Sequence, residues 1–314
     1  MYKLSLILFV FFIFTGCATK SHQFIQAQQC PFEDLKINQT NSFCAPPRTT
    51  LLEDSKLFIG FDNGAILTWD LDTNKLLHRF TQIDLFPIQH LQLHQQKLYA
   101  ASRSMQLKKY SLLGELENEV NYEKGSLFCL ENSLDHIYVG FGNAELGTLR
   151  IDDLELLEIK KDHEYLIYSL YKDGNTLYSG GDDNKLIVWE ITSDGSLKKI
   201  RSLQNFSSSI IRITKYHSSL FLGLGDGTII QLDNNFDQTK YETNKTQAPI
   251  TSLIASEKYL VSGDADGKVI LYSLDSHRLK EVESLKLESS IRSIISYEGS
   301  YLIFTKQGFI QKIE

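Results

Sequence analysis

The sequence lacks a surplus of positive charge. It has 32 Lys and Arg residues against 39 Asp and Glu residues, which gives a formal net charge of −7. Proteins that bind nucleic acids usually carry a basic surface, so this class of function is disfavoured. The sequence also lacks a glycine-rich phosphate loop and a nucleophile elbow. Residues 223–227, Gly-Leu-Gly-Asp-Gly, come nearest to a phosphate loop, but they lie at a hairpin turn with no helix after it.

The hydrophobic run at residues 4–14 is too short to cross a membrane. It is apolar except for Ser5, whereas a membrane-spanning helix needs about 20 apolar residues. Because it follows Lys3 and leads to small residues, it predicts a secretory signal over residues 1–16. The sequence Phe14-Thr15-Gly16-Cys17 resembles the bacterial lipoprotein box, in which the cysteine becomes the lipidated first residue. The resemblance, with Ala18 next, implies a periplasmic protein anchored through Cys17 in the inner leaflet of the outer membrane. An ordinary signal peptide and an uncleaved anchor are the alternatives.

The chain has only four cysteines. Cys17 is assigned to the lipid, and the polar, Gln-rich residues 17–33 are predicted to form a tether. Cys30 and Cys44 bracket a short segment before the first repeat, and export to an oxidising compartment would allow a disulfide between them. The spacing does not decide whether it forms. Cys129 lies between apolar neighbours and is expected to be a buried small hydrophobic residue.

What the sequence does contain is a repeated hairpin, clearest at residues 177–191. Two β-type runs there flank a polar turn of Gly, Asp and Asn. Equivalent small or apolar anchor residues recur every 39 to 43 residues, at Gly60, Ala101, Gly140, Gly180, Gly223, Gly263 and Phe304. A large apolar residue follows each anchor after nine positions, and glycine completes the turn at residues 64, 227, 267 and 308. Such a period is typical of the four-stranded blades of a β-propeller.

The sequence Ser-Gly-Gly-Asp-Asp, followed by Leu-Ile-Val-Trp-Glu, resembles the signature of the WD40-repeat family. The resemblance covers residues 34–314 and implies an all-β, seven-bladed β-propeller behind the signal (1–16) and the tether (17–33). The last copy ends after its third strand. We therefore expect the strand-like residues 32–40 to supply the outer strand of blade seven and close the ring.

The same resemblance implies a structural hydrogen-bond network in the fourth blade, formed by His163, Ser169, Asp183 and Trp189. These residue types are those of a catalytic triad, but in the family the network is structural, so no catalysis is expected. His90 and His94 fall on one strand about 13 Å apart, too far to share a metal ion. No metal, no cofactor and no enzymatic activity are predicted.

A partner-binding face is expected where the loops lead into the inner strands. Exposed aromatic side chains on loops are common at interfaces, and the loops of this chain offer Phe86, Tyr122, Tyr165 and Phe206. Arginines 48, 212 and 292 lie on inner strands near the central channel. They either pair with acidic residues of adjacent blades or form a site for an anion or an acidic peptide. Arg48 and Arg292 are therefore included in the candidate face.

The resemblance implies a non-enzymatic periplasmic scaffold or assembly factor whose partners are other periplasmic or membrane-associated proteins. The exported seven-repeat plan looks like the accessory propeller protein of periplasmic nitrate reductase systems. One alternative is an outer-membrane β-barrel assembly lipoprotein, a family with typically eight blades and many tryptophans, whereas this chain has two. Another is a quinone-dependent dehydrogenase propeller, whose tryptophan-docked blades and acidic metal site have no counterpart here.

Overall fold

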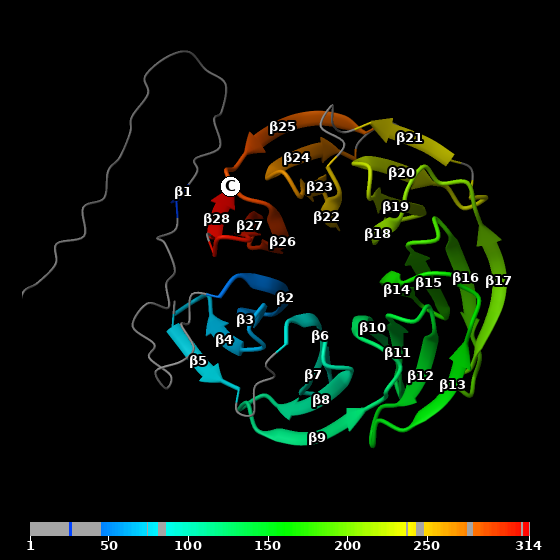
Figure 1. Cartoon of the computed structure of the whole chain (residues 1–314). Coiled ribbons are helices and arrows are strands. Elements are labelled where there is room, and N and C mark those ends of the chain that lie inside the picture. Colours follow the sequence, from blue (N-terminus) through cyan, green and yellow to red (C-terminus); the bar gives the residue numbers. More distant parts are fainter. Residues whose placement is uncertain are drawn as a thin grey trace, which may run out of the picture.

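The computed structural model describes residues 25–26, 45–73, 75–80, 86–236, 238–242, 248–274, 279–308 and 310–313. These residues form seven four-stranded antiparallel sheets arranged around a common axis (Figure 1). The chain is an all-β propeller. Within these ranges, no helix is long and apolar enough to cross a membrane. The predicted lipidation at Cys17 and the predicted Cys30–Cys44 disulfide lie outside the described residues.

Six of the sheets each consist of four consecutive strands, running from the axis outward. In chain order they are β2 (Pro47–Glu53), β3 (Lys56–Phe61), β4 (Ile66–Asp70) and β5 (Lys75–Arg79); β6 (Ile88–His94), β7 (Lys97–Ser102), β8 (Gln106–Ser111) and β9 (Leu116–Asn121); β10 (Leu127–Asn132), β11 (His136–Phe141), β12 (Leu146–Arg150) and β13 (Leu156–Lys160). They continue with β14 (Ile167–Asp173), β15 (Thr176–Gly181), β16 (Leu186–Ile191) and β17 (Leu197–Leu203); β18 (Ile210–Tyr216), β19 (Ser219–Leu224), β20 (Thr228–Leu232) and β21 (Gln238–Glu242); β22 (Ile250–Ala255), β23 (Tyr259–Asp264), β24 (Lys268–Ser273) and β25 (Lys280–Lys286).

The remaining sheet joins the two ends of the chain. It combines β26 (Ile291–Tyr297), β27 (Ser300–Thr305) and β28 (Ile310–Ile313) with the two-residue strand β1 (Ile25–Gln26), which places Ile25 opposite Lys312. The prediction that residues 32–40 occupy this edge is wrong, because β1 occupies it; residues 32–40 themselves lie outside the described residues. An edge strand is selected through its backbone groups, which almost any sequence can offer, so a strand-like pattern alone does not identify the segment that pairs there.

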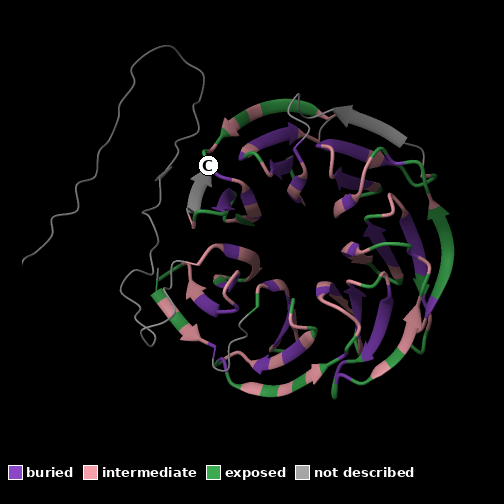
Figure 2. Cartoon of the chain, in the orientation of Figure 1, coloured by how far each residue is buried: buried purple, intermediate pink, exposed green. Residues whose placement is uncertain are grey.

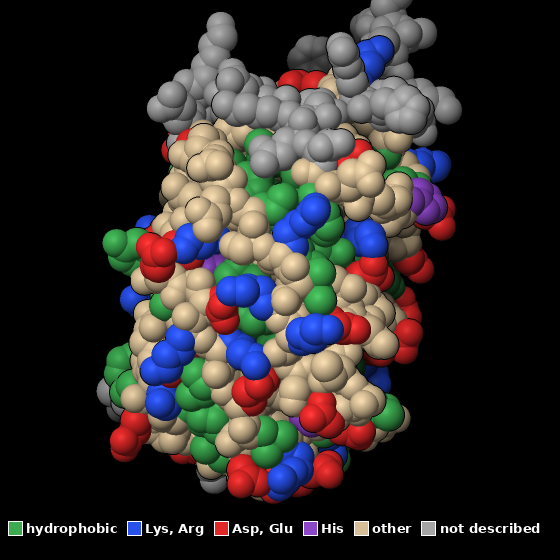
Figure 3. Space-filling model, turned by 90° about the vertical axis from the view of Figure 1, so that its right-hand side faces the viewer, with side chains coloured by type: hydrophobic (Ala, Val, Ile, Leu, Met, Phe, Trp, Pro, Cys, Tyr) green, Lys and Arg blue, Asp and Glu red, His purple; other side chains and the backbone are tan. Residues whose placement is uncertain are grey.

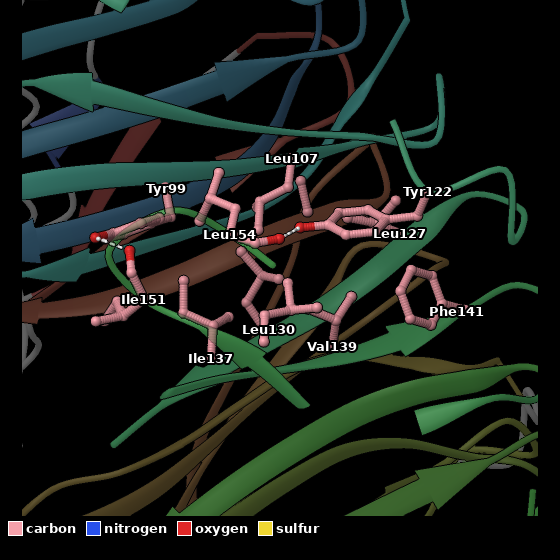
Figure 4. Packing of buried hydrophobic residues seen from close by; sticks show 12 residues of the cluster. Tyr99, Leu107, Tyr122, Leu127, Leu130, Ile137, Val139, Phe141, Ile151 and Leu154 are labelled. Carbon is pink, nitrogen blue, oxygen red and sulfur yellow. Dashed lines mark hydrogen bonds between the residues drawn. The ribbon is translucent and has the colours of Figure 1, made fainter. Parts of the chain in front are cut away.

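The hydrophobic core lies between neighbouring sheets. Figure 2 shows that buried residues concentrate in the middle strands, whereas the outermost strands are exposed or half-buried. Between the sheets of β6 and β10, one cluster includes Leu107, Leu127, Ile137 and Val139. The hydroxyl of Tyr122 closes it by donating to the carbonyl of Leu154 at 2.7 Å (Figure 4). Each sheet is therefore covered on both faces, as in a propeller.

The small anchor residue of each repeat makes room for the next inner strand. A Cβ atom on Gly180 would lie 2.5 Å from Cγ2 of Ile210. The same contact, at 2.5 to 3.0 Å, recurs in the pairs Gly60–Ile88, Gly140–Ile167, Gly180–Ile210, Gly223–Ile250 and Gly263–Ile291. In the second blade the anchor is Ala101, and the inner strand of the next blade carries Leu127 at the position of these isoleucines. Leucine is not β-branched, and both residues belong to one core cluster. Blade packing thus explains the glycine of the repeat.

The hairpin turns share a left-handed backbone position four residues after the anchor. Its φ lies between 57° and 92° in all seven copies, namely Gly64, Met105, Ala144, Asn184, Gly227, Gly267 and Gly308. In several turns the preceding Asn or Asp side chain accepts an amide hydrogen, as Asn63 does from Ala65 at 3.1 Å. Glycine suits this position because it has no Cβ.

Replacing Ala144 by glycine is expected to raise the free energy of unfolding by about 1 kcal/mol, because alanine is strained at its φ of 71°. Urea denaturation measures the change. Ala265→Gly is the matched control: Ala265 lies in an equivalent turn but is not among the residues with positive φ. We expect this variant to lose about 0.5–1 kcal/mol, through greater freedom of the unfolded chain. Equal effects at both positions would contradict the argument from φ.

Charged side chains protect the outer rim of the ring. Figure 3 shows Lys and Arg side chains interspersed with Asp and Glu side chains on this side of the molecule. On the edge strand β17, Lys198 pairs with Glu190 at 3.2 Å and Lys199 pairs with Asp162. Charges on an edge strand oppose pairing with another chain. The rim is thus a poor candidate for the partner site.

Candidate functional site

A buried chain of hydrogen bonds runs through the fourth repeat, from Asp183 to Trp189. Nδ1 of His163 lies 3.0 Å from both carboxylate oxygens of Asp183, and Nε2 lies 2.8 Å from Oγ of Ser179. Nε1 of Trp189 donates to the same Oγ at 2.9 Å. Since a carboxylate only accepts, His163 donates from Nδ1 and, when neutral, accepts the Ser179 hydroxyl hydrogen at Nε2. The chain therefore links a loop, a turn and two strands.

Three of the four residues predicted for this network lie in it, and the fourth, Ser169, does not. The serine that bridges His163 and Trp189 is Ser179, on β15, whereas Ser169 lies on the neighbouring strand β14, opposite Gly180. The physical reason is the alternation of side chains along a strand. Leu177 pairs with Trp189, so Ser179, two residues further on, points to the same face as the indole.

Asp183 is held in its ionised form. Its burial opposes ionisation, but the hydrogen bond and charge of His163, with the amides of Glu164 and Lys185, outweigh burial and lower the pKa of Asp183 below its ordinary value. A carboxylate whose pKa is lowered by folding stabilises the fold above its unfolded pKa. This stability is lost as the pH falls through the lower, folded pKa.

The variant Asp183→Asn tests this pH dependence. At neutral pH we expect wild type to be the more stable protein, since the amide cannot replace the charged partner of His163. Below the unfolded pKa of about 3.9 the difference in the free energy of unfolding should narrow, because unfolded wild type then binds a proton, and it should be lost once the pH falls through the lower, folded pKa. Urea denaturation between pH 2.5 and 7 measures both proteins. A difference that stays constant over this range would show that ionisation of Asp183 contributes nothing.

The network also holds the loop that leads into β14. Oδ2 of Asp183 accepts the amide of Glu164 at 3.0 Å, and the carbonyl of Leu166 accepts the amide of Asp182 at 2.8 Å. Between these two pinned residues lies Tyr165, which is 61% exposed. The structure thus presents a large aromatic side chain on a loop that is fixed at both sides.

Two of the four predicted loop aromatics are exposed and two are not. Phe86 is 51% exposed and, like Tyr165, lies at the surface. Tyr122 and Phe206 are 9% and 5% exposed, and their assignment to the partner-binding face is wrong. Tyr122 packs its ring edge-on to Phe141 at 5.7 Å, and Phe206 belongs to the core cluster around β18. Both fill gaps between sheets, which the loop position alone does not indicate.

A pocket of about 500 Å³ is lined in part by Leu166, the residue that follows Tyr165 in the chain. It is lined by residues of the loop into β10, the β11–β12 turn and the loop into β14: Glu123, Lys124, Gly125, Ser126, Phe128, Gly142, Asn143 and Leu166. The ring of Phe128 meets that of Tyr168 edge-on at 6.3 Å. We define the loop-face arc as Lys124 and Phe128 of the pocket, the exposed Met105 of the β7–β8 turn, and the exposed Phe86 and Tyr165 of the loops into β6 and β14. Sequence reasoning missed the pocket, although an aromatic residue at 128, on an inner strand, was a signal.

Arg48 and Arg292 share one acidic partner near the ring axis. Nη1 of Arg48 lies 3.4 Å from Asp62, and Nη2 of Arg292 lies 3.7 Å from the same carboxylate. Arg48 also donates to Oε1 of Gln89 at 3.0 and 3.2 Å. Pairing with an acidic residue is therefore the arrangement that these two arginines adopt, and they are half-buried rather than part of the loop-face arc.

The two histidines of β6 are bound to the neighbouring inner strand. Nδ1 of His90 accepts the amide of Leu130 at 3.0 Å, and Nδ1 of His94 lies 2.8 Å from Nδ2 of Asn132. Burial lowers the pKa of His90 to about 4, with a further contribution from Arg212, so the ring is neutral. In the part of the chain that the structure describes, no three His, Cys, Asp or Glu side chains gather as a metal site would require.

The fold and the site together define a β-propeller with a WD-type hairpin. Residues 155–190 match the family model described as "WD domain, G-beta repeat". The matched segment runs from β13 through β16 and contains the whole hydrogen-bond chain. Among solved structures, the chain is similar to the computationally designed Ika8 protein, with 18% identity and a TM-score of 0.69. The similarity covers 85% of this chain and 83% of that one, and at this identity it shows the fold alone.

Proposed function

We propose that this propeller is a non-enzymatic scaffold that binds a segment of a partner protein at the loop-face arc. The observation that carries the proposal is the exposed Tyr165 on a loop that the His163–Asp183 pair holds in place, next in the chain to Leu166, which lines the pocket. Exposed aromatic side chains are typical of protein interfaces. Phe128 and Leu166 line the pocket, so the partner segment is expected to insert an apolar side chain there.

The absence of enzymatic activity is part of the proposal. Ser179, His163 and Asp183 have the order of a catalytic triad, but Ser179 is 0% exposed. Its oxygen also accepts the indole hydrogen of Trp189. A nucleophile must reach a substrate carbonyl, which a sealed hydroxyl cannot do.

The finer parts of the proposal come from the sequence. We propose that the protein is lipid-anchored through Cys17 on the periplasmic face of the outer membrane and that its ring has seven blades, closed by the N-terminal segment. Its partner is then a periplasmic or membrane-associated protein, and we propose one belonging to a periplasmic nitrate reductase system. Pairing of β1 with β28 supports the closure. An outer-membrane β-barrel assembly role predicts barrel-assembly subunits as partners instead.

Site-specific photo-cross-linking in intact cells tests the partner site. A photoreactive residue replaces Tyr165 in one variant and Ile200 in the other. Ile200 is the matched control, because it is a large apolar residue with 55% exposure on the outer strand β17. We expect one discrete adduct from position 165 and none from position 200, and we expect Phe128→Ala to weaken the adduct at 165.

Mass spectrometry of the adduct identifies the partner and separates the candidate roles. Nitrate reductase subunits would support the finer proposal, whereas barrel-assembly subunits would replace it with the alternative. Equal adducts from both positions, or none from 165, would overturn the partner site. Fractionation of a Cys17→Ala variant tests the anchor independently, since an anchored protein should leave the membrane fraction when the cysteine is lost.

A further inference from the structure

Arg212 interacts electrostatically with residues of three other blades. Arg212 is on the inner strand β18, yet it interacts electrostatically with Arg48 on β2, His90 on β6 and Cys129 on β10. None of these strands is next to β18, because the inner strands follow one another as β2, β6, β10, β14, β18, β22 and β26 (Figure 1). A side chain of β18 can approach all three only near the centre.

Arg212 has no counter-charge among the described residues. Its guanidinium donates to the carbonyl of Ile211 at 2.8 Å, and no ion pair involves it within the described ranges. Of its neighbours, Arg48 is positive, His90 is neutral, and burial raises the pKa of the Cys129 thiol, so that the thiol stays protonated. Burial in these surroundings lowers the pKa of Arg212 to about 10, which still leaves it charged at neutral pH.

The acidic residues Asp62 and Glu131 interact with basic side chains other than Arg212. Asp62 is shared between Arg48 and Arg292. Glu131, on β10, has Lys172 as its basic neighbour, and burial raises its pKa to about 7, so it carries only part of a charge. Arg48 and Arg292 therefore share the single carboxylate of Asp62, and Arg212 has no ion pair within the described ranges. A buried charge without a partner is costly, which favours an anion from solution.

Unused hydrogen-bond donors lie on the side chains that contact Arg48 and Asp62. Nε of Arg292 and Nε2 of Gln89 are buried and have no hydrogen-bond partner among the described residues. Of the five N–H groups of Arg212, only the bond to Ile211 is made within the described ranges. The side chain is not sealed off, because Arg212 keeps an intermediate exposure. Planar guanidinium groups are well suited to bind the oxygens of carboxylate and phosphate.

We propose that the ring axis is a binding site for a small oxyanion, a carboxylate or a phosphate, with Arg212 as its principal ligand and Arg48 as a second charge. The anion supplies the counter-charge that the fold itself does not give Arg212. This site is separate from the loop-face arc and does not depend on the scaffold function.

Thermal unfolding tests the proposal with acetate and inorganic phosphate as probes. The protein is first dialysed into a buffer of low ionic strength whose only anion is a bulky sulfonate. We expect the Tm of wild type to rise by about 5 °C once one probe exceeds its Kd about a hundredfold. The probe that acts at the lower concentration shows whether carboxylate or phosphate is preferred. The variant Arg212→Met should show no such rise and should melt above wild type in the sulfonate buffer without probe, because the uncompensated charge is gone.

Arg201→Met is the matched control. Arg201 is an exposed arginine of the outer strand β17, with its guanidinium 5.1 Å from the ring of Phe236. This variant should respond to the probes as wild type does, which separates binding from general effects of salt. The proposal is overturned if wild type and Arg212→Met respond equally, if neither probe acts on wild type, or if Arg212→Met melts below wild type without probe. Isothermal titration calorimetry measures the binding of each probe to the folded proteins directly and so tests the proposal without relying on unfolding.

Discussion

Replacing Ser179 by alanine is expected to lower the free energy of unfolding by about 2–6 kcal/mol, because it leaves two buried groups without partners. The indole N–H of Trp189 and Nε2 of His163 both bond to the hydroxyl that is removed. Each buried polar group left unsatisfied costs about 1–3 kcal/mol. The change in volume is small, so packing contributes little. Urea denaturation, followed through tryptophan fluorescence, measures the loss.

Ser169→Ala provides the matched control. Ser169 is a serine of similar burial on the adjacent strand, but it bonds to neither His163 nor Trp189. Its substitution is expected to cost less than about 1 kcal/mol. If the two alanine variants lose the same stability, the hydrogen-bond chain adds nothing beyond the burial of a serine. A double variant with Trp189→Phe should cost less than the sum of the single changes, since the two residues share one bond.

The two serines also show how far sequence reasoning reached in the site. The turn residue Asp183 and the strand residue Trp189 follow from the repeat, because both hold fixed positions relative to Gly180. Choosing between Ser169 and Ser179 required the register of β15 against β16, in which Leu177 faces Trp189. With that register the period of two along a strand selects Ser179. The missing information was the register of β15 against β16. The position of Trp189, nine residues after the anchor, indicates that register.

Loop side chains were harder to predict than strands. Strand periodicity depends on local alternation, which the sequence displays directly. Whether Tyr122 is buried and Tyr165 exposed depends on residues distant in the chain: Tyr122 meets Leu154 and Phe141, whereas Tyr165 extends from a pinned loop. The edge strand β1 was missed for a related reason, because pairing with β28 uses backbone groups rather than a side-chain pattern. The repeat thus predicted the strands of each blade. It did not predict which loop side chains fill the gaps between blades or which strand completes the last sheet.

The variant Gly180→Ala is expected to lower the free energy of unfolding by about 1–3 kcal/mol, since the added Cβ would lie 2.5 Å from Ile210. The chain itself suggests how to relieve the clash. At the second blade alanine already occupies the anchor position, and Leu127 stands where the other inner strands carry isoleucine or, in β2, proline. Leucine branches one carbon further from the backbone, which moves its methyl groups away from the anchor.

The double variant Gly180→Ala with Ile210→Leu is therefore expected to recover part of the stability lost by Gly180→Ala. Ile210→Leu alone should cost less than about 1.5 kcal/mol, because it conserves volume. The four proteins form a double-mutant cycle, and we expect its coupling energy to favour the alanine–leucine pair by about 1 kcal/mol. Additive losses would show that the anchor is small for a reason other than Ile210. A favourable coupling would instead show that the size of the anchor residue is matched to the first residue of the next inner strand. This match explains why the anchor is glycine wherever the next inner strand begins with isoleucine.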